Sequence, residues 1–299
     1  MILSLKNVSK TYPNGVKALD NVTININAGM FGLLGPNGAG KSSMMRTIAT
    51  LQSPDSGSIH LDGLDILNNK IEFRKTLGYL PQEFGVYPKM SAHDLLHYFA
   101  SLKGITSKSE RNAIVDKALE VTNLSDVRNK HVAGYSGGMK QRFGIAQLLL
   151  NDPKLIIVDE PTAGLDPAER HRFLNVLREI GTNHIVIFST HIVDDVKELC
   201  TDMAILNGGK ILAQATPKQM TAALAGKIWT TTVDREGIEQ MQQDFNVISS
   251  NYNEDNKLNV RVYGETSPGD AFAKADPTLE DVYFTTLSND KFIAETEIA

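Results

Sequence analysis

A glycine-rich stretch in the first 50 residues has the residue types needed to bind a phosphate chain. It fits the pattern G-x-x-x-x-G-K-[ST] and consists of Gly35, Pro36, Asn37, Gly38, Ala39, Gly40, Lys41, Ser42 and Ser43. Glycines let successive backbone N–H groups curl around an anion, Lys41 supplies a positive charge, and Ser42 offers a hydroxyl to Mg²⁺. An apolar run precedes the stretch and a helical pattern follows it. This strand–loop–helix context predicts a binding site for a nucleotide and Mg²⁺.

Two carboxylates follow another apolar run, residues 155–158. They are Asp159 and Glu160. The carboxyl ends of buried parallel strands form the edge at which α/β proteins bind ligands. At that edge Asp159 is placed to hold Mg²⁺, and Glu160 is placed to accept a proton from an attacking water. Taken alone, the pair is also compatible with a strand end in solvent, but the phosphate loop favours the catalytic interpretation.

Ser136, Gly137 and Gly138 begin an apolar helical pattern. Ser136 is a good helix cap, and the two glycines allow an anion to approach the positive end of the helix. A plain capped helix would look similar. Two phosphate-binding helix ends with one nucleotide per chain favour a dimer, in which each such end completes the partner's site.

The segments that must position these residues follow an α/β pattern. Uniformly apolar runs near helix-length segments are typical of strands buried on both faces of a largely parallel sheet, and they lie at 30–34, 155–158, 185–188 and 203–206. Apolar residues at helical spacing predict an inserted helical subdomain over 91–150. Residues 2–27 and 57–67 predict a smaller sheet of antiparallel strands.

The composition excludes several classes of protein. With 299 residues, 41% apolar and 22% charged, the chain is expected to fold rather than remain disordered. It has no long uninterrupted apolar run and no secretory signal at its start, so we expect a cytosolic protein. Cys200 is the only cysteine, which rules out an intrachain disulfide. The net charge of −5 argues against broad nucleic-acid binding.

The charge is unevenly distributed along the chain. Residues 226–299 hold 6 Lys and Arg against 14 Asp and Glu, whereas residues 1–225 hold 24 against 21. This shift predicts one domain over 1–225 and a C-terminal extension over 226–299. The extension has β-like pieces around a helical 237–243, and an apolar stripe begins at 279. It is expected to be a small α+β unit that is regulatory or stabilises a dimer.

In type and order, these motifs resemble those of the nucleotide-binding subunits of ABC (ATP-binding cassette) transporters, over about residues 2–220. Residues 35–43 resemble the Walker A loop, 155–160 the Walker B strand, and Ser136-Gly137-Gly138 the family signature. The signature departs from its commonest form, with Tyr135 in place of Leu and Met139 in place of Gln. The resemblance implies a P-loop NTPase core that binds ATP and Mg²⁺.

The resemblance also assigns roles to single residues. It implies a catalytic group of Lys41, Gln82, Glu160 and His191, and Mg²⁺ ligands at Ser42, Gln82 and Asp159. Tyr12 would stack on adenine, Asp166 would cross the dimer interface, and residues 136–139 would contact the partner's nucleotide. Without the resemblance, Tyr12 reads as a turn residue, Gln82 as a surface amide, Asp166 as a helix cap and His191 as a structural histidine.

As a whole, the resemblance implies an ATPase that drives a separate transmembrane permease from the cytoplasmic face of the membrane. A second cassette, expected to be a copy of this chain, would complete the ATP sites. The loop 83–88, with Phe84, Val86 and Tyr87, would contact the permease. Residues 276–284 resemble a tail of exporters for drugs, lipids, polysaccharides or lantibiotics. The alternatives are a soluble cassette ATPase, of the iron–sulfur assembly or translation type, and a scaffold that never hydrolyses ATP.

Overall fold

The computed structural model describes residues 1–85 and 87–288, which form two compact units. The first unit is Met1–Ile211, and the second begins at Leu212. The change in composition at 225/226 falls inside the second unit, just after its first helix, α8 (Pro217–Ala223). Val86, one of the residues expected to contact a permease, lies outside the described part. None of the described helices combines the length and the apolar character needed to span a membrane.

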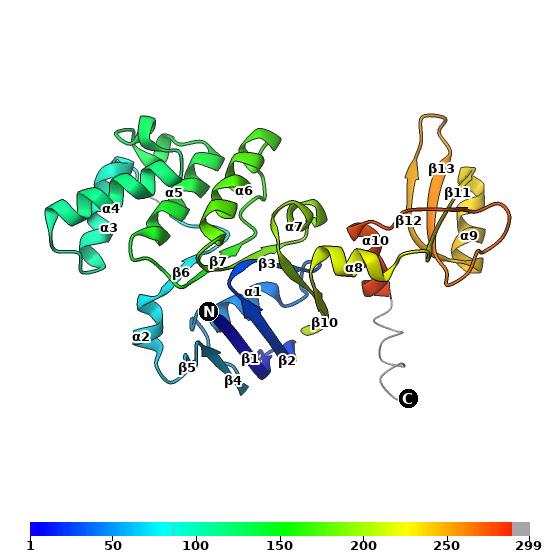
Figure 1. Ribbon diagram of the computed structural model, residues 1–299, viewed down its shortest axis with the longest axis horizontal. Helices are drawn as coiled ribbons and strands as arrows, with labels where there is room; N and C mark the ends of the chain where they lie inside the picture. Colours follow the sequence, from blue (N-terminus) through cyan, green and yellow to red (C-terminus); the bar gives the residue numbers. More distant parts are fainter. Residues whose placement is uncertain (86, 289–299) are drawn as a thin grey trace. The chain divides into compact units, whose positions relative to one another are not determined.

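Two sheets form the centre of the first unit (Figure 1). One has the strand order β10-β9-β3-β8-β7-β6, formed by β3 (Gly29–Leu34), β6 (Leu77–Leu80), β7 (Leu155–Asp159), β8 (Ile185–Thr190), β9 (Asp202–Asn207) and β10 (Lys210–Ala215). The chain passes from the first unit into the second within β10. Its strands from β9 to β6 run parallel to their neighbours. The other sheet is antiparallel, in the order β2-β1-β4-β5, formed by β1 (Ile2–Thr11), β2 (Lys17–Asn27), β4 (Ser56–Leu61) and β5 (Leu64–Asp65). Both predicted sheets are confirmed.

The helices of the first unit are α1 (Lys41–Ile48), α2 (Lys70–Lys75), α3 (Ala92–Leu102), α4 (Lys108–Val121), α5 (Gly137–Leu149), α6 (Pro167–Gly181) and α7 (Val193–Leu199). The segment 91–150 is fully described and contains α3, α4 and α5 but no strand, as predicted. These three helices lie together in Figure 1. Ser91, Ser107 and Ser136 cap them by accepting a hydrogen bond from a backbone N–H in the first turn, which satisfies one of the unpaired donors there.

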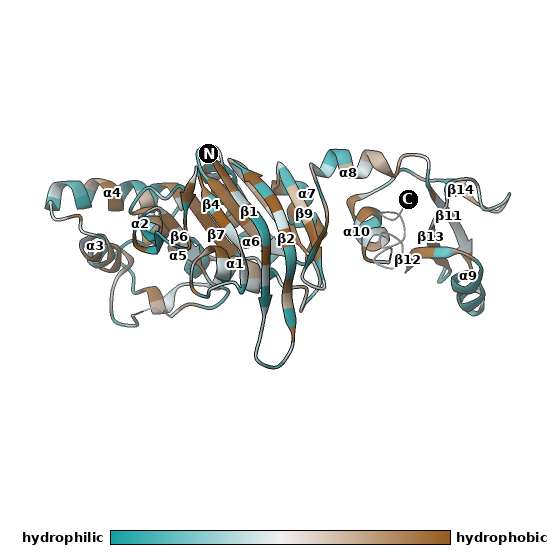
Figure 2. Ribbon diagram, turned by 90° about the horizontal axis from the view of Figure 1, so that it is seen from below, coloured by the Kyte–Doolittle hydropathy of each residue, from teal (hydrophilic) through white to brown (hydrophobic). Residues whose placement is uncertain are grey.

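The parallel strands are buried on both faces, and successive residues enter different cores. Ile157 packs in the cluster that fills the space to the antiparallel sheet, whereas Ile156 and Val158 pack with α6 on the opposite face. Figure 2 shows β7 as strongly apolar, while polar and apolar residues alternate along β1 and β2. Because side chains alternate strictly, a slip of one residue would move every side chain of a strand into the wrong core.

The second unit contains a four-stranded antiparallel sheet in the order β12-β13-β11-β14. The strands are β11 (Ile228–Val233), β12 (Asn246–Tyr252), β13 (Leu258–Tyr263) and β14 (Ala273–Lys274), and the remaining helices are α9 (Ile238–Asp244) and α10 (Leu279–Ser288). β11, β12 and β13 overlap the β-like pieces that the sequence predicts at 228–233, 245–249 and 258–263, and α9 overlaps the predicted helical 237–243. The two-residue strand β14 was not predicted.

A buried carboxylate ties α10 to this sheet. Asp281 is 1% exposed and accepts hydrogen bonds from Nε and Nη2 of Arg261 on β13, at 2.8 and 2.7 Å. The backbone N–H of Thr278 adds a third, at 2.7 Å. Burial raises the pKa of Asp281, but these hydrogen bonds outweigh it and hold the pKa below the ordinary value of 3.8. The stabilisation is therefore present at neutral pH and is lost as the pH falls through this lowered pKa.

Asp281→Asn should destabilise the second unit by about 2–3 kcal/mol, because it leaves the Arg261 guanidinium without its carboxylate. Trp229, the only tryptophan of the chain, lies on β11, so its fluorescence during urea unfolding reports on this unit. The matched control is Lys227→Met, which removes an exposed ion pair with Glu265 and should change stability by less than about 1 kcal/mol. Equal losses in the two variants would contradict the assigned role of Asp281.

Candidate functional site

The site is formed where three neighbouring parallel strands end. In the sheet β8 lies between β3 and β7, and the register pairs Leu34 with Thr190 and Asp159 with Ser189. The phosphate loop begins directly after β3. Glu160 directly follows the last residue of β7, and His191 directly follows the last residue of β8. The structure therefore brings the predicted phosphate loop, both carboxylates and the histidine to one edge of the sheet, where α/β proteins bind ligands.

The backbone of the phosphate loop leaves no room for side chains at two positions. A Cβ at Gly35 would lie 2.3 Å from the carbonyl oxygen of Leu206, and one at Gly40 would lie 2.4 Å from that of Ala18. Gly40 also has a φ of 109°, which L-residues with a side chain rarely adopt. The loop thus passes close to neighbouring backbone before it enters α1, and the N-terminus of a helix is suited to bind an anion.

Lys41 is a buried cation held at the start of α1. Its side chain is 4% exposed, and Nζ donates hydrogen bonds to the carbonyl oxygens of Gly35 at 2.7 Å and Pro36 at 3.2 Å. Nζ also lies 3.3 Å from Oε1 of Glu160. A buried ammonium requires such partners, since removing it from water is strongly unfavourable.

Glu160 is the residue that links the predicted catalytic groups. While Oε1 faces Lys41, Oε2 lies 3.4 Å from Nδ1 of His191. Its φ of 44° is an uncommon backbone conformation that the neighbouring structure must maintain, and such strain is concentrated at functional sites. The backbone N–H of Glu160 donates to Oγ of Ser189 at 3.0 Å, and that hydroxyl donates to Oδ1 of Asp159 at 2.7 Å. Ser189, to which the sequence assigned no role, thus joins the backbone of Glu160 to the side chain of Asp159.

Two cavities lie beside these groups. One, of about 450 Å³, is lined by the phosphate loop, Tyr12, Gln82 and Glu160. The other, of about 550 Å³, is lined by Asp159 and Tyr79 among others, and Ser42 and Gln82 line both. Burial raises the pKa of Tyr79, and the nearby charge of Asp159 adds to this. The first cavity has the size of a small-molecule site.

The donor set between the two cavities suits Mg²⁺. It comprises the hydroxyl of Ser42, the carboxylate of Asp159 and the side-chain amide of Gln82, which are hard oxygen donors. Across residues 1–85 and 87–288 there is no group of three or more His, Cys, Asp or Glu that could hold a metal ion. The fit is thus to an ion bound by few protein ligands, as is usual for Mg²⁺ with a phosphate substrate.

Tyr12 lies in the wall of the 450 Å³ cavity, as expected for a residue near the base of a nucleotide. Its hydroxyl is 3.1 Å from Oγ of Ser43 and donates to Oε1 of Gln52, also at 3.1 Å. These contacts fix the position of the ring beside the phosphate loop. Stacking on adenine stays a prediction.

The signature residues and Asp166 do not join the site within this chain, because none of them lines either cavity. Ser136 caps α5 by accepting from the N–H of Met139 at 3.2 Å. A Cβ at Gly138 would lie 2.1 Å from Oε2 of Glu169, so the glycine permits α6 to approach α5 closely. Asp166 caps α6 by accepting from the N–H of Glu169 at 2.9 Å. Their contribution to a partner's site stays a prediction.

Sequence reasoning also missed a buried carboxylate beneath the site. Asp195 on α7 is fully buried and accepts hydrogen bonds from Nε of Arg170 at 2.6 Å and Oγ1 of Thr162 at 2.7 Å. Oγ1 of Thr190 donates to it at 3.4 Å. It therefore joins α6, the turn after β7 and the end of β8. Asp195 lies beside Asp194 in the first turn of α7, where acidic residues are common because they complement the helix dipole. The sequence therefore carries no distinct signal for its buried role.

Asp195→Ala should destabilise the first unit by about 3 kcal/mol, because it leaves Arg170 unpaired and a cavity beneath the site. The matched control is Glu198→Ala, also on α7, which removes the exposed contact with His171 on α6. That variant should lose less than about 1 kcal/mol. Urea unfolding followed by far-UV circular dichroism measures both, and a loss for Asp195→Ala no larger than for the control would contradict this role.

The site can now be compared with known proteins. A family model described as "ABC transporter" matches residues 19–163. The chain is 35% identical to the Nod factor export ATP-binding protein I of Rhizobium etli over 227 residues, which cover 75% of this chain and 71% of that protein. It is 34% identical to the probable multidrug ABC transporter ATP-binding protein YbhF of Escherichia coli over 245 residues, 81% of this chain but only 42% of that longer protein.

A solved structure is similar as well. It is a dimeric ATP-binding cassette in a post-hydrolysis state with ADP and phosphate bound, and it matches with a TM-score of 0.64 and 27% identity over 72% of this chain and 98% of that one. The predicted α/β fold is thereby confirmed. On the strength of the relatives and of its own motifs, this chain belongs to the ATP-binding proteins of the ABC transporter family.

Proposed function

We propose that the chain binds and hydrolyses ATP and drives a separate membrane-spanning permease for export. The observation that carries the hydrolytic part is the position of Glu160 between Lys41 and His191, at the edge of the cavity lined by the phosphate loop. A carboxylate can accept the proton of an attacking water, and an ammonium can neutralise charge on the phosphoryl group. An imidazole beside them can bind a phosphate oxygen or position the water.

The contacts suggest how the residues divide the work. Glu160 is the only carboxylate of the described residues within 4.0 Å of Lys41 Nζ, so phosphates in the loop would offer the lysine a stronger anionic partner. Glu160 is then free to accept the proton of an attacking water, with His191 against its other oxygen. Ser42, Asp159 and Gln82 are the donors that would hold Mg²⁺, which neutralises charge on the phosphate chain when bound.

A dimer supplies what one chain lacks at its own site. The signature residues and Asp166 are placed away from both cavities. A homodimer that closes head to tail on two ATP molecules would bring Ser136, Gly137, Gly138 and Met139 to the partner's phosphates and Asp166 to the interface. The dimeric solved cassette supports this arrangement.

A cluster of aromatic residues near α3 is the surface proposed to contact the permease. Tyr87 and Tyr98 are 52% and 44% exposed, and their rings lie 6.2 Å apart, with Phe99 against both. Exposed apolar clusters of this kind mark interaction sites. Two relatives are named as a probable multidrug transporter ATP-binding protein and a Nod factor export ATP-binding protein, and these names support export and a position on the cytoplasmic face of the membrane. No specific observation favours the soluble iron–sulfur or translation type.

Glu160→Gln should lower ATP hydrolysis at least about 100-fold, because the amide cannot accept the proton. The variant should still bind ATP and should accumulate as a dimer, whereas Lys41→Ala should lose both hydrolysis and tight ATP binding. Phosphate release, ATP binding and size-exclusion chromatography measure these effects. Turnover by Glu160→Gln near the rate of the natural chain would remove Glu160 as the base.

The permease proposal is tested by copurification. The tagged chain, taken gently from native membranes, should retain a polypeptide with several apolar spans, identified by mass spectrometry. Tyr98→Glu should lose this partner while keeping ATP hydrolysis, because the charge disrupts an apolar contact. Tyr252→Glu, at a tyrosine 59% exposed on the second unit, is the matched control and should keep it. Recovery of soluble assembly factors or ribosomes alone would make the soluble cassette the working hypothesis.

A further inference from the structure

Ser189 is a buried hydroxyl at the end of an apolar row of side chains. Side chains alternate between the two faces of a strand, so Ser189 follows Ile185 and Ile187 on one face of β8. Both isoleucines belong to the core that fills the space to the antiparallel sheet. Ser189 itself is 0% exposed. A hydroxyl removed from water is unfavourable unless the protein supplies its hydrogen bonds, so Ser189 needs polar partners at this edge of the sheet.

Asp159 ends the neighbouring row on the same face of the sheet. It follows Leu155 and Ile157 on β7, which belong to the same core, and the parallel register pairs it with Ser189. Asp159 is 6% exposed and lines the 550 Å³ cavity. The register therefore places the two polar side chains next to each other, with apolar residues behind them.

The partners of Ser189 fix the direction of both its hydrogen bonds. The backbone N–H of Glu160 can only donate, so Oγ of Ser189 accepts from it at 3.0 Å. An ionised carboxylate can only accept, so the single proton of the hydroxyl is donated to Oδ1 of Asp159 at 2.7 Å. A hydroxyl turned away from Asp159 would leave Oδ1 without this donor.

This hydrogen bond makes the two oxygens of Asp159 different. Across residues 1–85 and 87–288, Asp159 accepts no side-chain hydrogen bond except the one from Ser189 to Oδ1. Oδ2 is left to bind another group. Asp159 lines the 550 Å³ cavity together with Ser42 and Gln82, the other oxygen donors that suit Mg²⁺.

We propose that Ser189 is a positioning residue for the metal ion of the ATP site. By holding Oδ1, its hydroxyl orients the carboxylate of Asp159 so that Oδ2 can bind Mg²⁺. Hydrogen-bond partners of metal-binding side chains typically contribute about 10- to 100-fold to metal affinity or activity. The proposal rests on the proposed binding of ATP and Mg²⁺, and it assigns a role to a residue that lines neither nucleotide cavity.

The test measures binding of Mn²⁺, which suits the same oxygen ligands as Mg²⁺ and is detected by electron paramagnetic resonance. The full chain, in slight excess over the non-hydrolysable analogue adenylyl imidodiphosphate, is titrated with Mn²⁺ while the signal of the free ion is followed. Ser189→Ala should weaken Mn²⁺ binding about tenfold, because Asp159 loses the donor that orients it. The affinity of this variant for the analogue in EDTA, measured by isothermal titration, should be unchanged, since the phosphate loop has no contact with Ser189 that a hydrogen bond supplies.

Two further variants make the comparison specific to this hydroxyl. Ser189→Thr retains a hydroxyl at the position and should bind Mn²⁺ nearly as tightly as the natural chain. Thr122→Val is the matched control, because it removes another fully buried hydroxyl, which donates to the carbonyl oxygen of Ala118 at 2.7 Å. Thr122 lines neither nucleotide cavity, so its loss should leave Mn²⁺ binding unchanged. Circular dichroism verifies that all three variants fold.

The outcomes separate this proposal from the proposed function. Absence of Mn²⁺ binding by the complex of the natural chain with the analogue would overturn both. Tight binding by the natural chain and equally tight binding by Ser189→Ala would overturn the role of Ser189 alone. Equal losses of Mn²⁺ affinity in Ser189→Ala and Ser189→Thr, or weaker binding of the analogue to Ser189→Ala in EDTA, would indicate a packing role and would also overturn it.

Discussion

Parallel pairing of β3, β8 and β7 in one register determines where the phosphate loop, Glu160 and His191 lie. Each strand delivers the residue that follows it to the same edge, so the phosphate loop, Glu160 and His191 meet although they are far apart in the sequence. The register is itself fixed by burial, because Ile156 and Ile157 enter different cores. The apolar residues that stabilise the sheet therefore also set the distances between the charged ones.

Charges buried at this edge constrain it further. Lys41 is almost fully buried and Asp195 is fully buried, and each is held by groups from several segments. Breaking such a set by removing one partner is strongly unfavourable, so the segments after β7 and β8 and the start of α6 are held in one arrangement. That rigidity is what preorganised stabilisation of charge in a transition state requires.

The sequence predicted the features whose signals are local. The strand at 155–158, the loop 35–43 and the serine cap at 136 are each specified within about ten consecutive residues, and the structure has them where they were expected. The missed features depend on partners that are distant in the sequence. Asp195 gains its role only from Thr162 and Arg170, and Ser189 gains its role only from the register of β7 and β8. The roles of Gly138 and Asp166 across an interface concern a second chain, so one chain leaves them as predictions.

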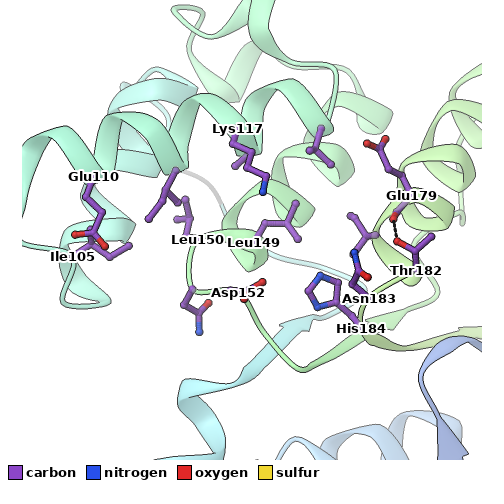
Figure 3. A pocket seen from close by; sticks show the side chains of 15 residues that line it. Ile105, Glu110, Lys117, Leu149, Leu150, Asp152, Glu179, Thr182, Asn183 and His184 are labelled. Atoms are coloured by element: carbon purple, nitrogen blue, oxygen red, sulfur yellow. Dashed lines mark hydrogen bonds between the residues drawn. The ribbon is translucent and has the colours of Figure 1, made fainter. Parts of the chain in front are cut away.

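Helices α5 and α6 connect the predicted dimer interface with the opposite edge of the sheet. Each is capped by a residue predicted to face a partner cassette, Ser136 for α5 and Asp166 for α6, and each ends at a cavity of about 690 Å³ (Figure 3). Near their N-termini they approach closely, since Gly138 lacks the side chain that would meet Glu169. A helix of 15 residues such as α6 spans about 22 Å as a rigid element. A ligand or partner at the far ends would therefore influence hydrolysis only to the extent that it binds one relative orientation of the two helices better than another.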